Sequence, residues 1–322
     1  MRQFAKPTIV VSKCLEFDAC RYNGEMIPDV TIRNLQPFVT FIPVCPEVEI
    51  GLGTPRETIR IVEENGENRL VQPSTREDVT EKMEQFSNDF LQTISGVDGF
   101  ILKNRSPSCG TRDVKIYSGF EKAPAKGKGS GLFGGAVVKK FSHLPIEEEG
   151  RLSNFIIREH FFTRLFTIAY YKMIKHNKNM KDLVSFQSDN KYLFMAYNQV
   201  KQKELGRIIA NHKNEKIEVV FENYEKTLYE LFMRTPRYTS NVNVCEHIFG
   251  YFKTKLKKQE KDHFIELLQK YAEKKIPLSS LLTILKSWAI RFDEKYLLRQ
   301  TYFEPYPEAL VEISDSGKGR DY

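Results

Sequence analysis

Three short apolar runs in the first half of the chain alternate with turns and with a helical stretch, and this alternation limits the folds open to it. The runs lie at residues 7–14 (P-T-I-V-V-S-K-C), 38–47 (F-V-T-F-I-P-V-C-P-E) and 97–103 (V-D-G-F-I-L-K). Residues 79–94 carry apolar side chains at helical spacing, which predicts an amphipathic helix before the last run. Strands that alternate with helices indicate a mostly parallel sheet. We therefore expect an α/β domain with such a sheet at the N-terminus.

A cysteine stands at or just beyond the end of each predicted strand. These are Cys14, Cys45 and Cys109, and Cys109 lies in the turn K-N-R-S-P-S-C-G. Ligands of parallel sheets bind outside the carboxyl ends of the strands, so we expect the three thiols to meet at one edge. Their spacing alone leaves three interpretations open: buried reduced thiols, an iron–sulfur cluster or a zinc site.

Composition narrows the classes of protein. The chain has 322 residues, 41% of them apolar, and no apolar run of about 18 residues, so no membrane span is expected. The N-terminus lacks the pattern of an export signal, which favours a cytoplasmic protein whose five cysteines are thiols or metal ligands. The first histidine is His143, so a Cys–His nucleophile is not expected in the α/β domain.

Charge divides the chain into two halves. Residues 1–150 contain 19 Lys and Arg against 21 Asp and Glu, and subtraction from the totals of 49 and 42 leaves 30 and 21, a net charge of +9. The stretch S-H-L-P-I-E-E-E-G-R-L-S-N (142–154) interrupts the periodic pattern with a proline, an acidic run and a glycine. We expect a junction there, with the boundary near Glu149 and domains at 1–149 and 150–322.

The second half is expected to be all-α. Apolar residues at helical spacing in F-I-I-R-E-H-F-F-T-R-L-F-T-I-A-Y-Y (155–171) predict the core of a helical bundle. Its surplus of Lys and Arg would neutralise RNA phosphates, although a solvated surface gives the same composition. Lys253, Lys257 and Lys261 are expected on one face of a helix, and His247 is expected to be a structural residue rather than a ligand.

One glycine-rich stretch invites a nucleotide-binding interpretation that its context does not support. Gly129 to Gly134 fit G-x-G-x-x-G, but no predicted strand precedes them and no acidic residue follows at the distance that a ribose requires. We expect the segment 127–135 to be a mobile loop near the site. Lys126 and Lys128 leave two interpretations, a lid over an anionic substrate or a solvated surface loop.

Five motifs give residues 6–140 a resemblance to the bacterial thiouracil/thiouridine desulfidase family. They are C-L at Cys14, C-R-Y-N-G from Cys20, P-V-C-P-E from Pro43, G-L-G-T-P-R from Gly51 and L-K-N-R-S-P-S-C-G from Leu102. The resemblance implies a [4Fe-4S] cluster held by Cys14, Cys45 and Cys109, with one iron that has no protein ligand and takes sulfur from the substrate.

The resemblance also implies an active-site carboxylate at Glu47 and a hydroxyl at Ser106. In such a site Glu47 would move protons to and from the attacking water, and Ser106 or Lys103 would hydrogen-bond the base. Water replaces sulfur at a thiocarbonyl carbon and hydrosulfide leaves, with no net electron transfer.

The second half resembles a helical domain that is often fused to such desulfidases. The likeness covers about residues 150–310 and is carried by K-Y-L-F-M-A-Y from Lys191, L-G-R-I-I-A from Leu205, N-V-N-V-C-E-H-I-F-G-Y-F-K from Asn241 and Q-T-Y-F-E-P-Y-P from Gln300. Such fusions imply action on 4-thiouridine in tRNA, with the helical domain as the RNA binder.

Two other functions stay open. A zinc-stabilised RNA-binding module without catalysis would use Cys20 as a fourth thiolate beside Cys14, Cys45 and Cys109. An iron–sulfur dehydratase or sulfur carrier would keep the cluster and bind a hydroxyacid or sulfide at its open iron.

Overall fold

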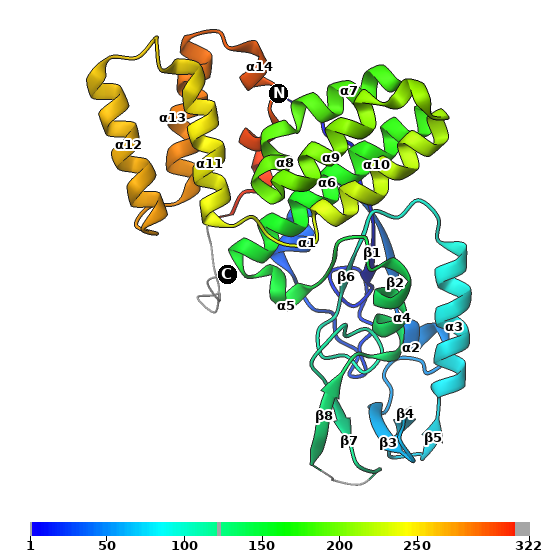
Figure 1. Cartoon of the computed structure of the whole chain (residues 1–322). Coiled ribbons are helices and arrows are strands. Elements are labelled where there is room, and N and C mark those ends of the chain that lie inside the picture. Colours follow the sequence, from blue (N-terminus) through cyan, green and yellow to red (C-terminus); the bar gives the residue numbers. More distant parts are fainter. Residues whose placement is uncertain (1, 121–123, 313–322) are drawn as a thin grey trace. The chain divides into compact units, whose positions relative to one another are not determined.

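The chain packs as two compact units, and a computed structural model describes residues 2–120 and 124–312 of it (Figure 1). The first unit ends at Ala169 and takes in the chain again from Ala309, and the second is Tyr170–Glu308. The first is α/β and the second all-helical, so the predicted fold class is confirmed. The break between the units falls within helix α6 (Phe155–Asn177), and the domain boundary near Glu149 stays a prediction.

Four parallel strands form the central sheet of the first unit, in the order β2-β1-β6-β9. Their bounds are Thr8–Ser12 for β1, Thr40–Val44 for β2, Gly99–Leu102 for β6 and Ile146–Glu148 for β9. The first three are the strands that the sequence predicts. β1 lies between β2 and β6, and its residues Ile9, Val10 and Val11 are fully buried. A parallel strand covered on both faces needs such a continuous apolar run.

Among the described residues, four helices lie between these strands in the chain, and a fifth follows the last strand. They are α1 (Val30–Leu35), α2 (Pro46–Glu49), α3 (Thr80–Thr93), α4 (Leu132–Phe141) and α5 (Glu149–Leu152). The predicted amphipathic helix is α3, which buries Met83, Ser87 and Leu91 at four-residue spacing. Phe133 of α4 packs against the rings of Phe86 and Phe90, so α3 and α4 pack on each other.

A second sheet, in the order β5-β4-β3-β7-β8, was not expected from the sequence. Its strands are β3 (Arg60–Glu64), β4 (Glu67–Gln72), β5 (Glu77–Asp78), β7 (Val114–Tyr117) and β8 (Ala125–Gly129). Only β3 and β7 pair in parallel. The strands are short and rich in charged residues or glycine, so their apolar periodicity is weak.

The mobile-loop interpretation of residues 127–135 is wrong. Ala125–Gly129 form β8, which pairs antiparallel with β7, and α4 begins three residues later. Lys126 and Lys128 form exposed ion pairs with Glu63 and Asp113. The two lysines are therefore held on the second sheet and do not form a lid.

Residues 142–154, where the sequence analysis expects a junction, form regular structure. The stretch contains β9, which pairs with β6 from Phe100 opposite Ile146 to Leu102 opposite Glu148, and then α5. β9 has only three residues, so its sequence shows no alternation of apolar and polar side chains. The nearby proline and glycine are typical of a loop.

The second unit is a bundle of helices around an aromatic core. The helices after α6 are α7 (Met180–Asp189), α8 (Lys191–Tyr197), α9 (Gln199–Ala210), α10 (Ile217–Leu231), α11 (Tyr238–Phe249), α12 (Lys258–Ala272), α13 (Leu278–Arg291) and α14 (Lys295–Leu298). Tyr171 stacks on Tyr224 with ring centroids 5.4 Å apart, and its hydroxyl donates to the carbonyl of Phe221. Across the described ranges, no helix combines the length and the apolar character needed to cross a bilayer.

The expected lysine face does not form on one helix. α11 ends at Phe249, a short 3₁₀ turn η2 follows at Gly250–Phe252, and α12 begins only at Lys258. Lys253 and Lys257 therefore lie in the connection, and only Lys261 lies on α12. His247 is exposed on α11.

Gly99 sets how closely β9 and α6 approach β6. A Cβ atom at this position would lie 2.9 Å from the Pro145 carbonyl oxygen and 3.1 Å from Cδ1 of Leu165. We expect Gly99→Ala to lower the free energy of unfolding by about 1–3 kcal/mol, the usual cost of overpacking. Urea unfolding measures the change. Gly127→Ala is the matched control, because nothing lies within 4 Å of its added methyl group; equal stability of the two variants would contradict this packing.

Candidate active site

The three cysteines that the sequence places at strand ends line one cavity. Cys14 lies two residues after β1, Cys45 directly follows β2, and Cys109 lies in the loop after β6. All three border a cavity of about 430 Å³ at the carboxyl edge of the parallel sheet. Glu47, Lys103 and Ser106 border the same cavity, so the structure brings together every site residue that the sequence analysis names.

Cys20 lies in this cavity as well, whereas Cys245 does not. The thiol of Cys45 points to the carbonyl oxygen of Cys20 at 3.9 Å, and Cys20 is buried. Cys245 is buried in the core of the helical unit, 3.9 Å from the hydroxyl of Tyr302. The cavity therefore has four thiols on its wall.

Burial determines the protonation of these thiols. It raises the pKa of Cys14 to about 12, and nearby Cys45 adds to the rise while Lys103 opposes it. Burial also raises the pKa of Cys20 to about 12 and that of Cys109 above its usual range. In the metal-free chain these three thiols keep their protons at neutral pH, so a metal group that binds them must displace protons.

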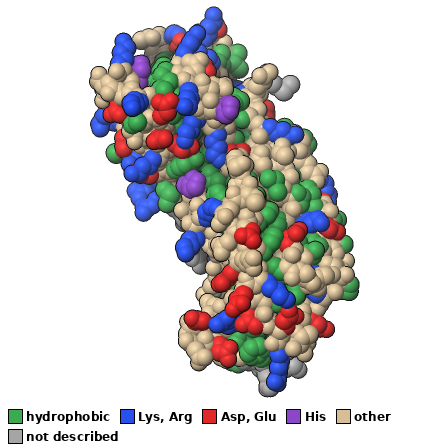
Figure 2. Space-filling view, turned by 90° about the vertical axis from the view of Figure 1, so that its right-hand side faces the viewer, with side chains coloured by type: hydrophobic (Ala, Val, Ile, Leu, Met, Phe, Trp, Pro, Cys, Tyr) green, Lys and Arg blue, Asp and Glu red, His purple; other side chains and the backbone are tan. Residues whose placement is uncertain are grey.

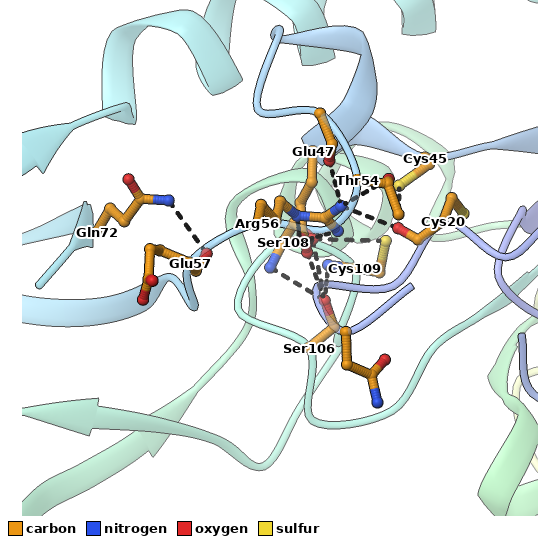
Figure 3. A network of polar contacts seen from close by, with 12 residues as sticks. Cys20, Cys45, Glu47, Thr54, Arg56, Glu57, Gln72, Ser106, Ser108 and Cys109 are labelled. Atoms are coloured by element: carbon orange, nitrogen blue, oxygen red, sulfur yellow. Dashed lines mark hydrogen bonds and ion pairs between the residues drawn. The ribbon is translucent and has the colours of Figure 1, made fainter. Parts of the chain in front are cut away.

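Glu47 is held from two sides (Figure 3). Its Oε2 atom accepts hydrogen bonds from Nε and Nη2 of Arg56, the former at 2.9 Å. Its Oε1 atom accepts from the hydroxyl of Ser108 at 2.5 Å and from that of Ser106 at 3.5 Å. The side chains of Arg56 and Glu47 are only 4% and 13% exposed, so this ion pair is shielded from water.

Arg56 and Ser108 were not identified from the sequence. Arg56 ends the G-L-G-T-P-R motif and also donates to the carbonyl oxygens of Cys20 and Gly53, both at 2.9 Å. Ser108 stands next to Cys109, and its hydroxyl lies 2.9 Å from that of Ser106. Both residues stand in motifs that the sequence analysis names. Their contact with Glu47 is seen only in the folded chain.

Two carboxylates, one at the end of β9 and one at the start of α5, hold the loop that carries Ser106 and Cys109. Glu149 forms an ion pair with Lys103 at 2.5 Å and accepts from the backbone N–H of Asn104 at 2.7 Å. Glu148 accepts from the backbone N–H groups of Thr111 and Arg112, at 2.7 and 3.2 Å, and from the Thr111 hydroxyl. Two carboxylates thus fix both ends of this loop, and one of them engages the ammonium group of Lys103.

The glycines of the G-x-G-x-x-G stretch let α4 pack on the same loop. A Cβ atom at Gly134 would overlap the carbonyl oxygens of Cys109 and Gly110. The N–H groups of Gly131 and Gly134 donate to the carbonyl oxygens of Gly110 and Ser108 at 2.7 and 2.9 Å. Glycine is needed here for close approach of two backbones.

Two family models match separate parts of the chain. Residues 9–149 match a family model described as 2-thiouracil desulfurase, and residues 191–307 match a model described as a protein of unknown function, DUF1722. The uncharacterized protein YbgA of Escherichia coli K12 is 23% identical over 156 residues, 48% of this chain and 92% of YbgA. The uncharacterized protein YbbK of Bacillus subtilis 168 is 36% identical over 118 residues, 34% of this chain and 77% of YbbK.

One solved structure is also similar. It is that of TudS, a [4Fe-4S]-dependent thiouracil desulfidase, with 26% sequence identity and a TM-score of 0.37. The similarity covers 46% of this chain and 93% of TudS.

The acidic run offers a matched pair of variants. Glu148→Ala removes a buried carboxylate that accepts from three donors at Thr111 and Arg112, and a hydrogen bond to a charged group contributes about 1.5–3 kcal/mol. We expect faster amide hydrogen exchange at Thr111 and Arg112 and a lower free energy of unfolding. Glu147→Ala removes an ion pair with Arg151 at the end of the same strand and should change stability by less than about 1 kcal/mol. If both variants exchange alike, Glu148 does not hold the loop.

Proposed function

This chain belongs to the 2-thiouracil desulfurase family, and on that premise we propose that it hydrolyses the carbon–sulfur bond of 4-thiouridine in tRNA and of free thiouracil. Uridine or uracil and hydrosulfide are the products. The carbon–sulfur bond breaks, a carbon–oxygen bond to water forms, and no electrons are gained or lost. One observation supports the proposal above all: three thiols that follow strands line the same cavity as a carboxylate that Arg56 holds in place.

The thiols fit a [4Fe-4S] cluster. Cys14, Cys45 and Cys109 stand around the wall of a cavity, and among the described residues no three Cys, His, Asp or Glu side chains lie close enough to hold a single metal ion. Three thiolates would hold three of the four irons of such a cluster and leave one without a protein ligand. When bound, the cluster would supply a soft Lewis acid for the thiocarbonyl sulfur.

The residues around the cavity suit proton transfer to and from water. Arg56 occupies Oε2 of Glu47 and fixes its orientation, which leaves Oε1 as the atom that exchanges protons. Ser108 links this atom to Ser106 through hydroxyl contacts of 2.5 and 2.9 Å. Glu47 would accept a proton from the attacking water. The hydroxyl of Ser106 would hydrogen-bond the thiolated nucleobase of the substrate. Lys103, engaged by Glu149, would position the loop and favour negative charge in the cavity.

The helical unit supports a nucleic-acid substrate through its charge. The residues after position 150 have a net charge of +9, and Figure 2 shows many Lys and Arg side chains on the surface of this unit. A thiolated base in folded RNA must leave its stack, at a cost of a few kcal/mol. Contacts of this unit to the RNA backbone would offset that cost.

The position of Cys20 favours one alternative. Because Cys20 lines the cavity beside Cys45, the wall carries the four thiols that a structural zinc ion in a non-catalytic RNA-binding module would need, and zinc binding would have to draw them closer together. Metal analysis of anaerobically purified protein separates the two functions. Iron and acid-labile sulfide in a brown protein support the desulfidase, and stoichiometric zinc in a colourless protein contradicts it.

The cysteines give the next prediction. Alanine at Cys14, Cys45 or Cys109 is expected to abolish the brown colour and the bound iron, because each removes one of only three thiolate ligands. Cys20→Ala should keep most of the iron. Cys245→Ala is the control, since this thiol lies in the helical core. Full iron content in Cys109→Ala would contradict the ligand set.

Glu47→Gln tests the proton transfer. The amide keeps the shape of the side chain but is not a base, so desulfuration of 4-thiouracil should fall by about two to four orders of magnitude. Iron content should stay at the level of the unmodified protein. Loss of thiocarbonyl absorbance measures the rate, and Glu49→Gln, two residues along α2, is the control. Near-normal turnover of Glu47→Gln would show that another group activates the water.

A further inference from the structure

We propose that the end of α11 and the connection to α12 form the surface by which the helical unit binds RNA, at a segment where bases are unpaired. This inference rests on the proposed function, because it names where that unit contacts the RNA substrate. We define the α11 tip as His247, Tyr251, Lys253, Lys255, Lys257 and Lys258. They lie on consecutive stretches of the chain: the last turn of α11, the 3₁₀ turn η2, the connection that follows η2, and the first residue of α12.

The four lysines of the α11 tip form no ion pair with a described carboxylate, and only Lys257 acts electrostatically on a nearby acid, Glu260. All four are exposed, they fall within six positions, and in the described part of the chain no carboxylate lies within 4 Å of their ammonium groups. The nearest turn of α12 has one acid, Glu260, whose carboxylate is engaged by the backbone N–H of Lys257 and by Arg291. Elsewhere in this unit exposed lysines such as Lys178 and Lys275 are paired with glutamates. The α11 tip therefore concentrates free positive charge.

Two of these lysines are held by aromatic rings. The ammonium group of Lys253 lies 5.9 Å from the centre of the Phe249 ring, and that of Lys255 lies 5.6 Å from the centre of the Phe292 ring. The methylene chains of such lysines cover apolar surface, while their ammonium groups remain exposed to water. The charges are thus held at fixed places on the surface, as a backbone-binding site for phosphates requires.

Tyr251 adds an aromatic group beside the lysines. Its side chain is 37% exposed although two neighbours hold it: Tyr296 stacks on it with 6.2 Å between ring centroids, and Tyr192 donates to its hydroxyl at 3.3 Å. An exposed ring that is already fixed loses little entropy when a base stacks on it. His247 is exposed four positions earlier, near the end of α11, and offers a second ring.

This combination favours RNA with unpaired bases over an acidic protein. Lysines alone would suit either partner, because both carry negative charge. A fixed, exposed tyrosine among lysines matches the way single-stranded nucleic acid is bound, with phosphates on the cations and bases on the rings. Regular duplex RNA keeps its bases stacked inside, so loops and bulges supply the bases for Tyr251.

The lysines are tested by matched triple variants in the full-length, cluster-containing protein. Lys253→Gln/Lys255→Gln/Lys257→Gln removes three charges that form no ion pair with a described carboxylate. The control Lys178→Gln/Lys270→Gln/Lys275→Gln removes three charges that are paired with glutamates. Binding of unmodified tRNA is measured by anisotropy over a range of salt concentrations. Each lost phosphate contact lowers the slope of log Kd against log salt by about 0.7–0.9, so the tip variant should lose about 2–3 from the slope and the control should lose little.

The aromatic ring is tested separately. Tyr251→Ala is expected to weaken tRNA binding by about 5- to 150-fold, the equivalent of one lost base stack, without changing the salt slope. Tyr251→Phe keeps the ring and should bind nearly as tightly as the unmodified protein. Circular dichroism melts confirm that the variants stay folded. Turnover of free 4-thiouracil should be the same in all of them, because the α11 tip is no part of the catalytic cavity.

The outcomes separate this inference from the proposed function. If the unmodified protein binds tRNA and the tip variants bind it equally well, the surface is wrong and the proposed function stands. Equal losses in the two triple variants would mean that only net charge matters, which also overturns the surface. If Tyr251→Ala has no effect and polyglutamate competes as well as RNA, the tip binds acidic proteins. If the unmodified protein removes sulfur from 4-thiouracil but does not bind tRNA, the RNA partner itself is wrong.

Discussion

Parallel backbone pairing on both sides of β1 is the constraint on which the site depends. Because β1, β2 and β6 run in one direction, the chain leaves all three strands at the same edge, and a thiol follows each strand within a few residues. The fourth strand, β9, runs in the same direction, and carboxylates rather than a thiol stand at its end. One sheet thus places the groups that line the cavity and the groups that hold the cavity wall.

The two carboxylate oxygens of Glu47 have different kinds of hydrogen-bond donor, so proton exchange is expected at only one of them. A guanidinium, which does not give up its proton, occupies one oxygen, and two hydroxyls, which exchange protons readily, face the other. The same guanidinium reaches the carbonyl oxygens of Cys20 and Gly53, so it also ties the thiol-bearing segment to the loop after α2. Removing Arg56 would disturb the carboxylate and the cavity wall together.

Local sequence pattern predicted the elements that are apolar and regular, and it missed those that depend on partners. β1, β2, β6 and α3 have enough buried residues to show a period, and the cysteines at strand ends follow from the topology of a parallel sheet. β8 and β9 are short and polar, so only their pairing with β7 and β6 identifies them. For the same reason Arg56 and Ser108 stayed unassigned: no property of the sequence near them shows that they meet Glu47. The helix expected through Lys253 and Lys257 failed because a 3₁₀ turn and a connection interrupt it.

The position of the acidic run in the chain has a consequence for biosynthesis. The three strand-end thiols all precede residue 110, but the carboxylates of Glu148 and Glu149 that hold the Cys109 loop come almost forty positions later, at the end of the last strand of the sheet and the start of α5. A nascent chain that has left the ribosome only as far as α4 has all of its cavity thiols and neither of the carboxylates that hold the loop. The cavity therefore takes its final form only after β9 has been synthesised.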